Sequence, residues 1–325
     1  MNILLTGGAG YIGSHTTLAL IEKGHSVTVV DNLITGNLKL VPKEANFFET
    51  DISDEIKIKS LIKENKFDIV MHFAGLVKVE ESLKNPEKYN LYNFEKAKIF
   101  FKACVDLGIK KIIFSSTAGV YGKTKELKKI NEDDKIHPSN PYAKSKHQLE
   151  KYLISLSKER SISSIILRYF NVAGADKKNR TGMLTQNSNN LIKVLCETAV
   201  KKREKIIVNG NDYNTKDGTP VRDFIHVSDL ADIHLIVAEN LKENSQTNIY
   251  NCGYGVGYSV GEVISQMEKV LQRDLKKEYG QRRKDDIPYS VADIKKFQKK
   301  FDWMPKYNDL GYILKSALEW EKKIK

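Results

Sequence analysis

The chain has 325 residues, and its 53 Lys and Arg against 41 Asp and Glu give a formal charge of +12. This length allows one large α/β domain or two smaller lobes, and 41% hydrophobic with 29% charged residues exclude an intrinsically disordered chain. Because 45 of the basic residues are lysines scattered along the chain, whereas nucleic-acid surfaces cluster their charge with arginine and aromatic residues, we expect a lysine-rich surface and no nucleic-acid partner.

In the first half of the chain, segments of strand length alternate with segments of helical periodicity, which is the pattern of parallel βαβ units. Gly24 is expected to end the first helix, because glycine favours the left-handed conformation that follows helices. Ser53 is expected to cap the second helix, and Pro86 to open a third that ends near Gly108. The predicted strands are 3–6, 27–30, 47–48, 69–73, 112–115 and 163–168, and the predicted helices are 11–23, 53–65 and 86–108.

The alternation stops halfway along the chain, where the sequence becomes rich in Asn, Gly, Lys and Thr. A helix and a strand after Asp229 resume the pattern, which predicts that the sheet takes up a later piece of the chain. We therefore expect a nucleotide-binding domain, 1–170 plus about 226–252, and a smaller lobe, about 171–225 plus 253–325. The elements predicted in this half are a helix over 190–203, a strand over 206–208, a helix from 229 to about 241, a strand over 248–252 and two or three amphipathic helices in 259–325.

The sequence does not predict secretion, membrane insertion or metal binding. The first apolar run ends at Gly7 and is too short for the core of a signal peptide. Nowhere do about 18 apolar residues follow one another, so no membrane span is predicted. Cys104, Cys196 and Cys252 are far apart and form no Cys-x-x-Cys pair. We expect a cytoplasmic protein with reduced cysteines, no membrane partner and no metal.

A glycine-rich turn follows the first predicted strand and opens the first predicted helix. Its three glycines, Gly7, Gly10 and Gly13, have the spacing G-x-x-G-x-x-G. Such a backbone can turn tightly, approach a pyrophosphate closely and direct the amides of the helix N-terminus at its charge. Asp31 ends the second strand 18 residues after Gly13, where a carboxylate accepts hydrogen bonds from an adenosine ribose and repels a 2′-phosphate. The pattern therefore predicts binding of NAD rather than NADP.

A second motif, Tyr142-x-x-x-Lys146, begins a predicted helix, and its i, i+4 spacing places both side chains on one face. A tyrosine with its usual pKa of about 10 is a poor base at neutral pH, but a neighbouring cation favours the phenolate. The fifth predicted strand runs into Thr117, at the sheet edge where parallel sheets bind ligands. A hydroxyl, a phenol and an ammonium group can share a proton network there, around an alcohol or sugar oxygen.

Seven stretches between the first strand and the C-terminal lobe carry a family pattern. They are TGGAGYIGSH at 6–15, VDNL at 30–33, HFAG at 72–75, FSSTAGVYG at 114–122, PYAKSK at 141–146, LRYFNVAGA at 167–175 and DGTPVRDFIHVSDLA at 217–231. With them the chain resembles the extended short-chain dehydrogenase/reductase family, and within it the UDP-hexose 4-epimerases. The resemblance implies a Rossmann-like doubly wound parallel α/β sheet with a smaller mixed α/β lobe at the C-terminus that binds the UDP-sugar.

The activity implied by the resemblance is epimerisation at carbon 4 of UDP-glucose or UDP-galactose, through a 4-keto intermediate whose hydride returns from NAD to the opposite face. Tyr142 would take the proton of the 4-hydroxyl, and Thr117 would hydrogen-bond the same oxygen. Lys146 would bind the nicotinamide ribose and polarise Tyr142. Relatives pair through two helices, which implies a homodimer that uses 86–107 and 141–159.

The resemblance also implies binding residues at matching positions, among them arginines, whose planar fork suits a diphosphate. The cofactor-binding positions are Gly7, Gly10, Tyr11, Ile12, Gly13, Asp31, Asn32, Asp51, Ile52, Phe73, Ala74, Gly75, Asn93, Tyr142, Lys146 and Phe170. The substrate-binding positions are Thr117, Asn171, Asn190, Leu191, Arg222, Arg283, Asp286 and Ser290.

Three positions depart from the family pattern. Val77 stands where many members have a lysine, and Asn209 where an aromatic residue often lies near the uracil. Ser290 stands where members restricted to plain hexoses have a tyrosine beside the sugar 2-substituent. The resemblance therefore implies room for an N-acetyl group and additional turnover of UDP-N-acetylglucosamine and UDP-N-acetylgalactosamine, unless a one-residue slip in register puts Tyr289 at this gate.

The residues alone predict an NAD-dependent enzyme that acts on a hydroxyl group, and they leave epimerase and dehydrogenase open; the resemblance favours the epimerase. Dehydratases of the family carry an Asp-Glu pair after the active-site threonine, where this chain has Ala118-Gly119. A UDP-glucuronate 4-epimerase or another NAD-dependent sugar-nucleotide-modifying enzyme is an alternative. A second alternative is an NAD-sensing protein without catalytic activity, which the intact Tyr142 and Lys146 disfavour.

Overall fold

The computed structural model describes residues 1–123, 127–185, 188–283 and 286–324, and the chain divides into two units. The first unit comprises Met1–Val120, Ile136–Arg168 and Ala231–Tyr250, and the second comprises Tyr121–Lys135, Tyr169–Leu230 and Asn251–Lys325. The chain therefore passes between the units five times, and each unit is assembled from three separate stretches.

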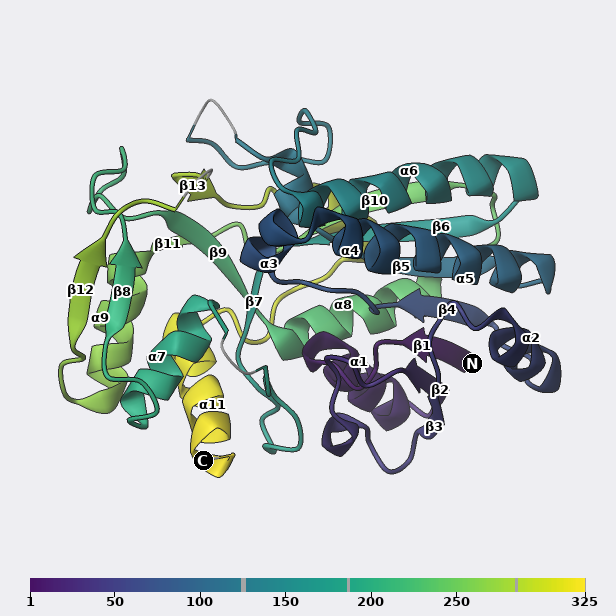
Figure 1. Ribbon diagram of the computed structural model, residues 1–325, viewed down its shortest axis with the longest axis horizontal. Coiled ribbons are helices and arrows are strands. Elements are labelled where there is room, and N and C mark those ends of the chain that lie inside the picture. The colour runs from purple at the N-terminus through teal and green to yellow at the C-terminus, as the bar shows by residue number, and fades with distance from the viewer. Residues whose placement is uncertain (124–126, 186–187, 284–285, 325) are drawn as a thin grey trace. The chain divides into compact units, whose positions relative to one another are not determined.

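A seven-stranded sheet forms the centre of the first unit (Figure 1). Its strands are β1 (Asn2–Thr6), β2 (Ser26–Asp31), β3 (Asn46–Glu49), β4 (Ile69–His72), β5 (Lys111–Thr117), β6 (Ser163–Tyr169) and β10 (Thr247–Cys252). Their spatial order is β10-β6-β5-β4-β1-β2-β3, and β1 pairs in parallel with both β2 and β4. The order reverses at β1, and open parallel sheets bind ligands at the carboxyl ends of strands beside such a reversal. The predicted Rossmann-like α/β fold is thus confirmed.

Helices cover both faces of this sheet. They are α1 (Tyr11–Glu22), α2 (Glu55–Glu64), α3 (Val79–Lys84), α4 (Pro86–Asn90), α5 (Lys96–Asp106), α6 (Pro141–Arg160) and α8 (Val227–Asn240). Helices α2, α5 and α6 bury apolar side chains against one face, such as Leu61, Phe101 and Leu149. Helix α1 contacts β1 and β2 on the other face, where Figure 1 also shows α8. Burial of each large apolar side chain stabilises the fold by about 1.5–3 kcal/mol, which holds the sheet rigid beneath its ligand-binding edge.

The cap of α2 lies one residue later than predicted. The Asp54 carboxylate accepts a main-chain amide of the first helical turn at 3.2 Å. Ser53, the predicted cap, instead donates its hydroxyl to Asp51 at 2.6 Å. Both residue types can cap a helix, and the turn after β3 decides between these two neighbours.

The predicted helix over 86–108 is wrong as a single element. A π-helical turn, η2 (Leu91–Glu95), stands between α4 and α5. It directs Asn93 inward, where the side chain is 1% exposed and hydrogen-bonds to both main-chain groups of Leu76. Such turns often mark functional sites, and this one supports the loop that follows β4.

The described residues of the second unit form short strands and four helices. Its strands are β7 (Asn171–Ala173), β8 (Ile206–Asn209), β9 (Val221–His226), β11 (Gly257–Ser259), β12 (Lys277–Gly280) and β13 (Tyr289–Ser290), and its helices are α7 (Leu191–Ala199), α9 (Val260–Leu271), α10 (Lys295–Phe301) and α11 (Leu310–Lys323). The last three helices confirm the prediction for 259–325, whereas α7 ends before the predicted position 203. Only β8 corresponds to a predicted strand. The central strand β9 pairs with β7, β11 and β13 from distant parts of the sequence.

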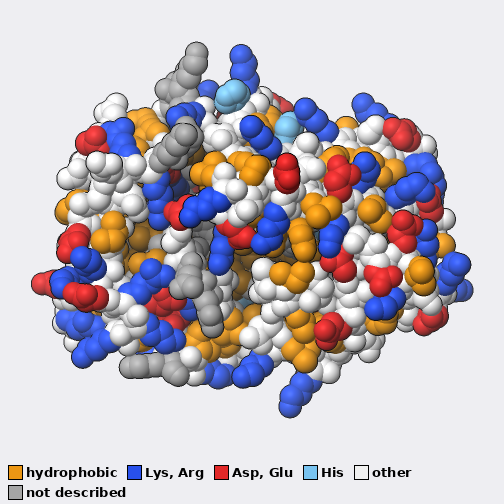
Figure 2. Space-filling view, viewed as in Figure 1, with side chains coloured by type: hydrophobic (Ala, Val, Ile, Leu, Met, Phe, Trp, Pro, Cys, Tyr) orange, Lys and Arg blue, Asp and Glu red, His pale blue; other side chains and the backbone are white. Residues whose placement is uncertain are grey.

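Basic residues are dispersed on the one face of the molecule that Figure 2 draws. On the face drawn in Figure 2, Lys and Arg side chains are mixed with acidic and apolar ones. Several lysines pair with acids on the same helix, such as Lys59 with Glu55 and Lys102 with Asp106, both at 2.5 Å. Exposed pairs of this kind contribute about 0–1 kcal/mol each. Within the described part of the chain, every helix is too short or too polar to cross a membrane.

Candidate active site

The glycine turn between β1 and α1 is shaped by close main-chain approaches. Gly7 has a φ of 75°, and a Cβ atom added to it would lie 2.5 Å from the main-chain nitrogen of Ala74. Gly10, the N-cap of α1, supplies no side-chain cap, and a helix N-terminus attracts anions through its main-chain amides. Asp31, at the end of β2, accepts the Ala9 amide at 3.1 Å. A tight glycine turn at the N-terminus of a helix fits the pyrophosphate of a dinucleotide.

The variant Gly7→Ala is expected to lose both stability and bound NAD. An alanine at this φ costs about 1–3 kcal/mol, and its methyl group would also displace the main chain after β4. Gly24→Ala is the matched control, because Gly24 has a φ of 80° and an added Cβ would meet no described atom within 4 Å. We expect about tenfold less NAD in purified Gly7→Ala than in Gly24→Ala, measured on cofactor released by denaturation. Equal contents would exclude a cofactor role for this turn.

A group of acceptors lies beside the turn, after β2 and β3. Burial raises the pKa of Asp31, which also accepts the Leu33 amide at 2.9 Å. Asn32 donates its side-chain amide to Asp51 at 2.9 Å, and Lys96 donates to the same carboxylate at 2.7 Å. Burial acts to raise the pKa of Asp51, but the hydrogen bonds outweigh it and lower the pKa to about 2. The carboxyl oxygens of Asp51 and Asp31 offer acceptors for the hydroxyl and amino groups of an adenosine.

Thr117, Tyr142 and Lys146 lie together in the first unit. Thr117 ends β5, and Tyr142 and Lys146 are one turn apart in α6. Asn140 fixes the start of that helix, because its side chain accepts the Ala143 amide at 2.9 Å. Burial raises the pKa of Tyr142, and a hydrogen bond with Thr117 lowers it in part. A phenol in this environment needs a nearby cation to act as a base at neutral pH.

Lys146 supplies this cation from a buried position. Its side chain is 3% exposed, and its ammonium group donates to the Ser115 carbonyl at 2.9 Å and lies 5.0 Å from the centre of the Phe114 ring. Burial lowers the pKa of Lys146 to about 8, and the charge of Glu150 offsets part of that fall. Lys146 is therefore mostly protonated at neutral pH, in surroundings of low polarity where its charge acts strongly on a neighbouring oxygen.

Glu150 belongs to a buried ion pair that the sequence analysis missed. It lies one turn after Lys146, is 1% exposed and accepts two hydrogen bonds from Arg168 of β6, at 2.8 and 3.0 Å. It also accepts the Ser116 hydroxyl of β5 at 2.5 Å. The pair thus ties α6 to two strands directly beneath Lys146. In the sequence, the i, i+4 spacing from Lys146 to Glu150 is the one signal that indicates a role for Glu150.

The loop after β4, which contains Phe73 and Ala74, is held against α6 by Asn93. This side chain accepts the Leu76 amide at 2.7 Å, donates to the Leu76 carbonyl at 2.9 Å and donates to the Ser145 hydroxyl at 3.2 Å. Gly75 approaches Lys146 so closely that a Cβ atom added to it would lie 3.6 Å from the ammonium nitrogen. The side chain of Asn93 is thus engaged in support of this loop.

In the second unit, a carboxylate holds an arginine in place. Arg222 of β9 pairs with Asp286 at 2.6 Å, and the Asp286 amide donates to the Arg283 carbonyl at 3.2 Å. Burial lowers the pKa of Arg222, and the charge of Arg283 acts in the same direction. Two neighbouring guanidinium groups suit the paired oxygens of a diphosphate. Tyr213 is an aromatic residue that was not predicted to lie here. Its hydroxyl hydrogen-bonds to the Asp286 carboxylate at 3.5 Å, and the centre of its ring lies 4.2 Å from the guanidinium carbon of Arg282.

The register of β13 shows which of Ser290 and Tyr289 lies on the same face of the sheet as Arg222. This strand runs parallel to β9, with Ser290 opposite Arg222 and Tyr289 opposite Val221. Because side chains alternate between the faces of a strand, Ser290 shares the face of Arg222. Tyr289 points to the other face, where its ring lies 3.9 Å from a Cβ atom added to Gly257. Ser290 is thus the small residue on the side of the arginine, and it is 8% exposed.

The remaining predicted residues belong to several elements. Tyr11, Ile12 and Gly13 form the first turn of α1, and Ile52 is buried after β3. In the second unit, Asn171 begins β7, Asn190 caps α7 directly before Leu191, and Phe170 is buried ahead of β7.

Comparisons with known proteins match nearly the whole chain. A family model described as the NAD dependent epimerase/dehydratase family matches residues 3–253. The UDP-glucose 4-epimerase of Azospirillum brasilense is 39% identical over 322 residues, which cover 99% of this chain and 92% of that protein. The UDP-glucose-4-epimerase from Stenotrophomonas maltophila, solved with bound NAD and formylated UDP-arabinopyranose, is similar with a TM-score of 0.95 and 32% identity, covering 100% of this chain and 98% of that one. The UDP-Glc/GlcNAc 4-epimerase from Campylobacter jejuni is 41% identical, with a TM-score of 0.85 and 99% of each chain covered.

Proposed function

We infer that this chain, which belongs to the NAD-dependent epimerase/dehydratase family, is an isomerase that inverts carbon 4 of a UDP-hexose with NAD as its cofactor. The observation that carries this inference is the group of Thr117, Tyr142 and Lys146: a hydroxyl, a phenol and a buried ammonium at the carboxyl edge of a dinucleotide-binding sheet. UDP-glucose and UDP-galactose differ in configuration at carbon 4, and they are the two compounds that the enzyme interconverts.

The first unit supplies the residues that suit NAD. Gly7 and Gly10 provide space for the pyrophosphate at the N-terminus of α1, and Asp31 and Asp51 provide acceptors for the adenosine. When bound, NAD accepts the hydride from carbon 4 and returns it to the opposite face. Lys146, whose ammonium lies beside Gly75, is placed to bind the nicotinamide ribose.

Tyr142 is the group that moves the proton in this proposal. Its phenolate takes the proton of the 4-hydroxyl as the hydride leaves, and returns it once the keto sugar has turned over. Because burial raises the pKa of Tyr142, the ionised form depends on the positive charge of Lys146. Thr117 donates a hydrogen bond to the same sugar oxygen and so keeps it within reach of the phenol.

The second unit supplies the contacts to UDP. Arg222 and Arg283 are proposed to bind the diphosphate, and Asp286 holds Arg222 in the required orientation. Asn171, Asn190 and Leu191 are proposed to contact the remainder of the nucleotide. A planar guanidinium that is already held by a carboxylate loses little freedom when it binds a phosphate, which favours affinity.

We further propose that the enzyme accepts both plain and N-acetylated hexoses. Ser290 lies on the sheet face of Arg222, whereas Tyr289 points to the other face. A small residue at this position leaves space beside the 2-substituent of the sugar. The similarity to a UDP-Glc/GlcNAc 4-epimerase at 41% identity supports the same range.

The variant Ser290→Tyr is expected to separate the two substrate types. The added ring would fill the space for the N-acetyl group, so kcat/KM for UDP-N-acetylgalactosamine should fall about 100-fold. The value for UDP-galactose should change less than about threefold, since the plain hydroxyl still fits. Tyr289→Ser is the control on the opposite face and should leave the ratio of the two substrates unchanged. Equal losses for both substrates in Ser290→Tyr would contradict this proposal.

Incubation of the purified protein without added cofactor tests the activity itself. UDP-galactose, UDP-N-acetylgalactosamine and UDP-glucuronate are supplied separately, and the products are separated by chromatography. Formation of the carbon-4 epimer of the first two supports the proposal. Exclusive turnover of UDP-glucuronate would replace the substrate assignment. Bound NAD without any turnover would indicate an NAD-sensing protein instead.

We also propose a homodimer that forms through the helices at 86–107 and 141–159. Leu83 and Leu91, which flank α4, are each 48% exposed, so that this region offers apolar surface to a second copy. Light scattering should give twice the monomer mass, and a monomer at micromolar concentration would contradict the proposal. A cytoplasmic location is proposed as well, because the three cysteines are buried free thiols, which suit a reducing compartment.

A further inference from the structure

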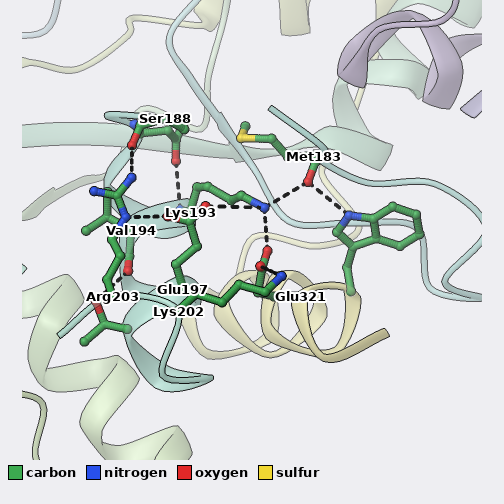
Figure 3. Close-up of polar contacts among 11 residues, drawn as sticks. Met183, Ser188, Lys193, Val194, Glu197, Lys202, Arg203 and Glu321 are labelled. Carbon is green, nitrogen blue, oxygen red and sulfur yellow. Dashed lines mark hydrogen bonds and ion pairs between the residues drawn. The ribbon is translucent and has the colours of Figure 1, made fainter. Parts of the chain in front are cut away.

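A buried ion pair joins two helices of the second unit (Figure 3). Lys193 of α7 is 8% exposed, and its ammonium group donates to Glu321 of α11 at 2.5 Å. Glu321 is 1% exposed and also pairs with Lys202 at 2.7 Å. Removing such charges from water costs free energy that their mutual attraction often fails to recover. Stability alone therefore does not explain why a lysine and a glutamate stand here.

The ammonium group of Lys193 also binds the chain at Met183. It donates to the main-chain oxygen of Met183 at 3.3 Å. The indole nitrogen of Trp320, the neighbour of Glu321, donates to the same oxygen at 3.1 Å. Figure 3 shows both donors converging on Met183. The Met183 carbonyl is thus fixed by two side chains that are themselves buried.

A second ion pair holds the residues directly before α7. Glu197, which is 9% exposed, pairs with Arg203. Arg203 in turn donates to the main-chain oxygen of Ser188 at 3.0 Å. The Ser188 hydroxyl accepts the main-chain amide of Asn190 at 3.1 Å. Two main-chain oxygens ahead of α7 are therefore bound by cations, and a buried carboxylate partners each cation.

Asn190 is the residue that this arrangement places. Its side-chain oxygen accepts the Lys193 main-chain amide at 3.2 Å and so caps α7, which leaves its NH2 group to donate to a ligand. We propose that Lys193, held by Glu321, is a positioning residue for UDP: it ties the first turn of α7 to α11 and so fixes Asn190 and Leu191, which open that helix, against the nucleotide. This inference rests on the proposed function, in which those two residues contact UDP.

The test compares Lys193→Met with Lys276→Met in the NAD-containing enzyme. Lys276 pairs with Glu204 at 2.5 Å in the same unit, but these side chains are 59% and 75% exposed, so the same replacement there leaves the start of α7 unchanged. Calorimetry gives the Kd for UDP, and turnover of UDP-galactose gives KM and kcat. For Lys193→Met we expect Kd and KM to rise about tenfold while kcat and NAD content stay within about twofold. Lys276→Met should match the wild type, and Lys193→Arg should recover most of the affinity.

A double variant keeps the test decisive if Lys193→Met does not fold. Lys193→Met with Glu321→Leu replaces the pair by apolar side chains and leaves Glu321 no unpaired charge to bury. The folded double variant should still bind UDP about tenfold more weakly, because the ion pair that fixes the first turn of α7 is lost. If the folded variants bind UDP as the wild type does, the inference is overturned while the proposed function stands. If the wild type neither binds UDP nor turns over a UDP-hexose, the proposed function fails and the inference with it.

Discussion

Replacing Tyr142 by phenylalanine is expected to lower kcat about 10³-fold. The variant keeps the ring, which makes an edge-to-face contact with Tyr89 at 6.5 Å, and loses only the hydroxyl that is hydrogen-bonded to Thr117. Thr117 can still hold the sugar oxygen, but an aliphatic hydroxyl is too weak a base to take its proton. The chemical step therefore loses its base while the site keeps its shape. Product formation from saturating UDP-galactose, with NAD content determined on the same sample, measures the effect.

Tyr152→Phe is the matched control for this experiment. Tyr152 lies in the same helix and is half-buried. Its replacement by phenylalanine also removes a phenol hydroxyl, but at a position away from Thr117 and Lys146. Its kcat should stay within about twofold of the wild type. A Tyr142→Phe enzyme with nearly normal turnover would contradict the assignment of the base. Loss of bound NAD together with activity would instead point to a role in binding the cofactor.

Glu150→Ala is expected to have the largest effect on stability, a loss of about 3–5 kcal/mol. The substitution leaves the guanidinium of Arg168, which is 3% exposed, buried without the carboxylate that accepts its two hydrogen bonds. It also removes the acceptor of the Ser116 hydroxyl. Urea unfolding of the NAD-containing protein, followed by fluorescence, gives the change in the free energy of unfolding.

The control for Glu150→Ala is an exposed ion pair in the same unit. Glu55→Ala removes the partner of Lys59 in α2, where both side chains are about half exposed, and should cost less than about 1 kcal/mol. Glu150→Gln keeps a hydrogen-bond acceptor for Arg168, so its free energy of unfolding should lie between those of the two alanine variants. A Glu150→Ala protein as stable as Glu55→Ala would show that Arg168 finds other partners or reaches water.

Much of the first unit can be predicted from the sequence because its signals are local. Strands β1, β2 and β4 are short apolar runs separated by segments of helical period, and their parallel arrangement follows from that alternation. The grouping of the glycine turn, and of Tyr142 with Lys146, is likewise set by residues close together in the chain. The cap of α2 marks the limit of such signals, since Ser53 and Asp54 are neighbours that can both cap a helix.

The second unit and the supports of the site cannot be predicted in this way. Asp223 is fully buried within β9, where its carboxylate accepts the main-chain amides of Tyr254 and Ala292 at 2.8 and 3.1 Å. A charged residue inside a strand breaks the apolar pattern, and its partners are known only once the chain has folded. Lys193 and Glu321 are 128 positions apart. Nothing in the sequence near either residue indicates that they meet.

The five passages of the chain between the units set the order in which the protein can be completed on the ribosome. The strands β1 to β6 have been synthesised by residue 169, but β10, which lies beside β6 at the edge of the sheet, follows only after β7, β8 and β9 of the second unit. The edge of β6 that pairs with β10 therefore stays unpaired while some 80 further residues are synthesised. An unpaired strand edge readily binds other chains. A protein truncated between β6 and β10 is thus a candidate for aggregation, and no single cut yields two independent domains.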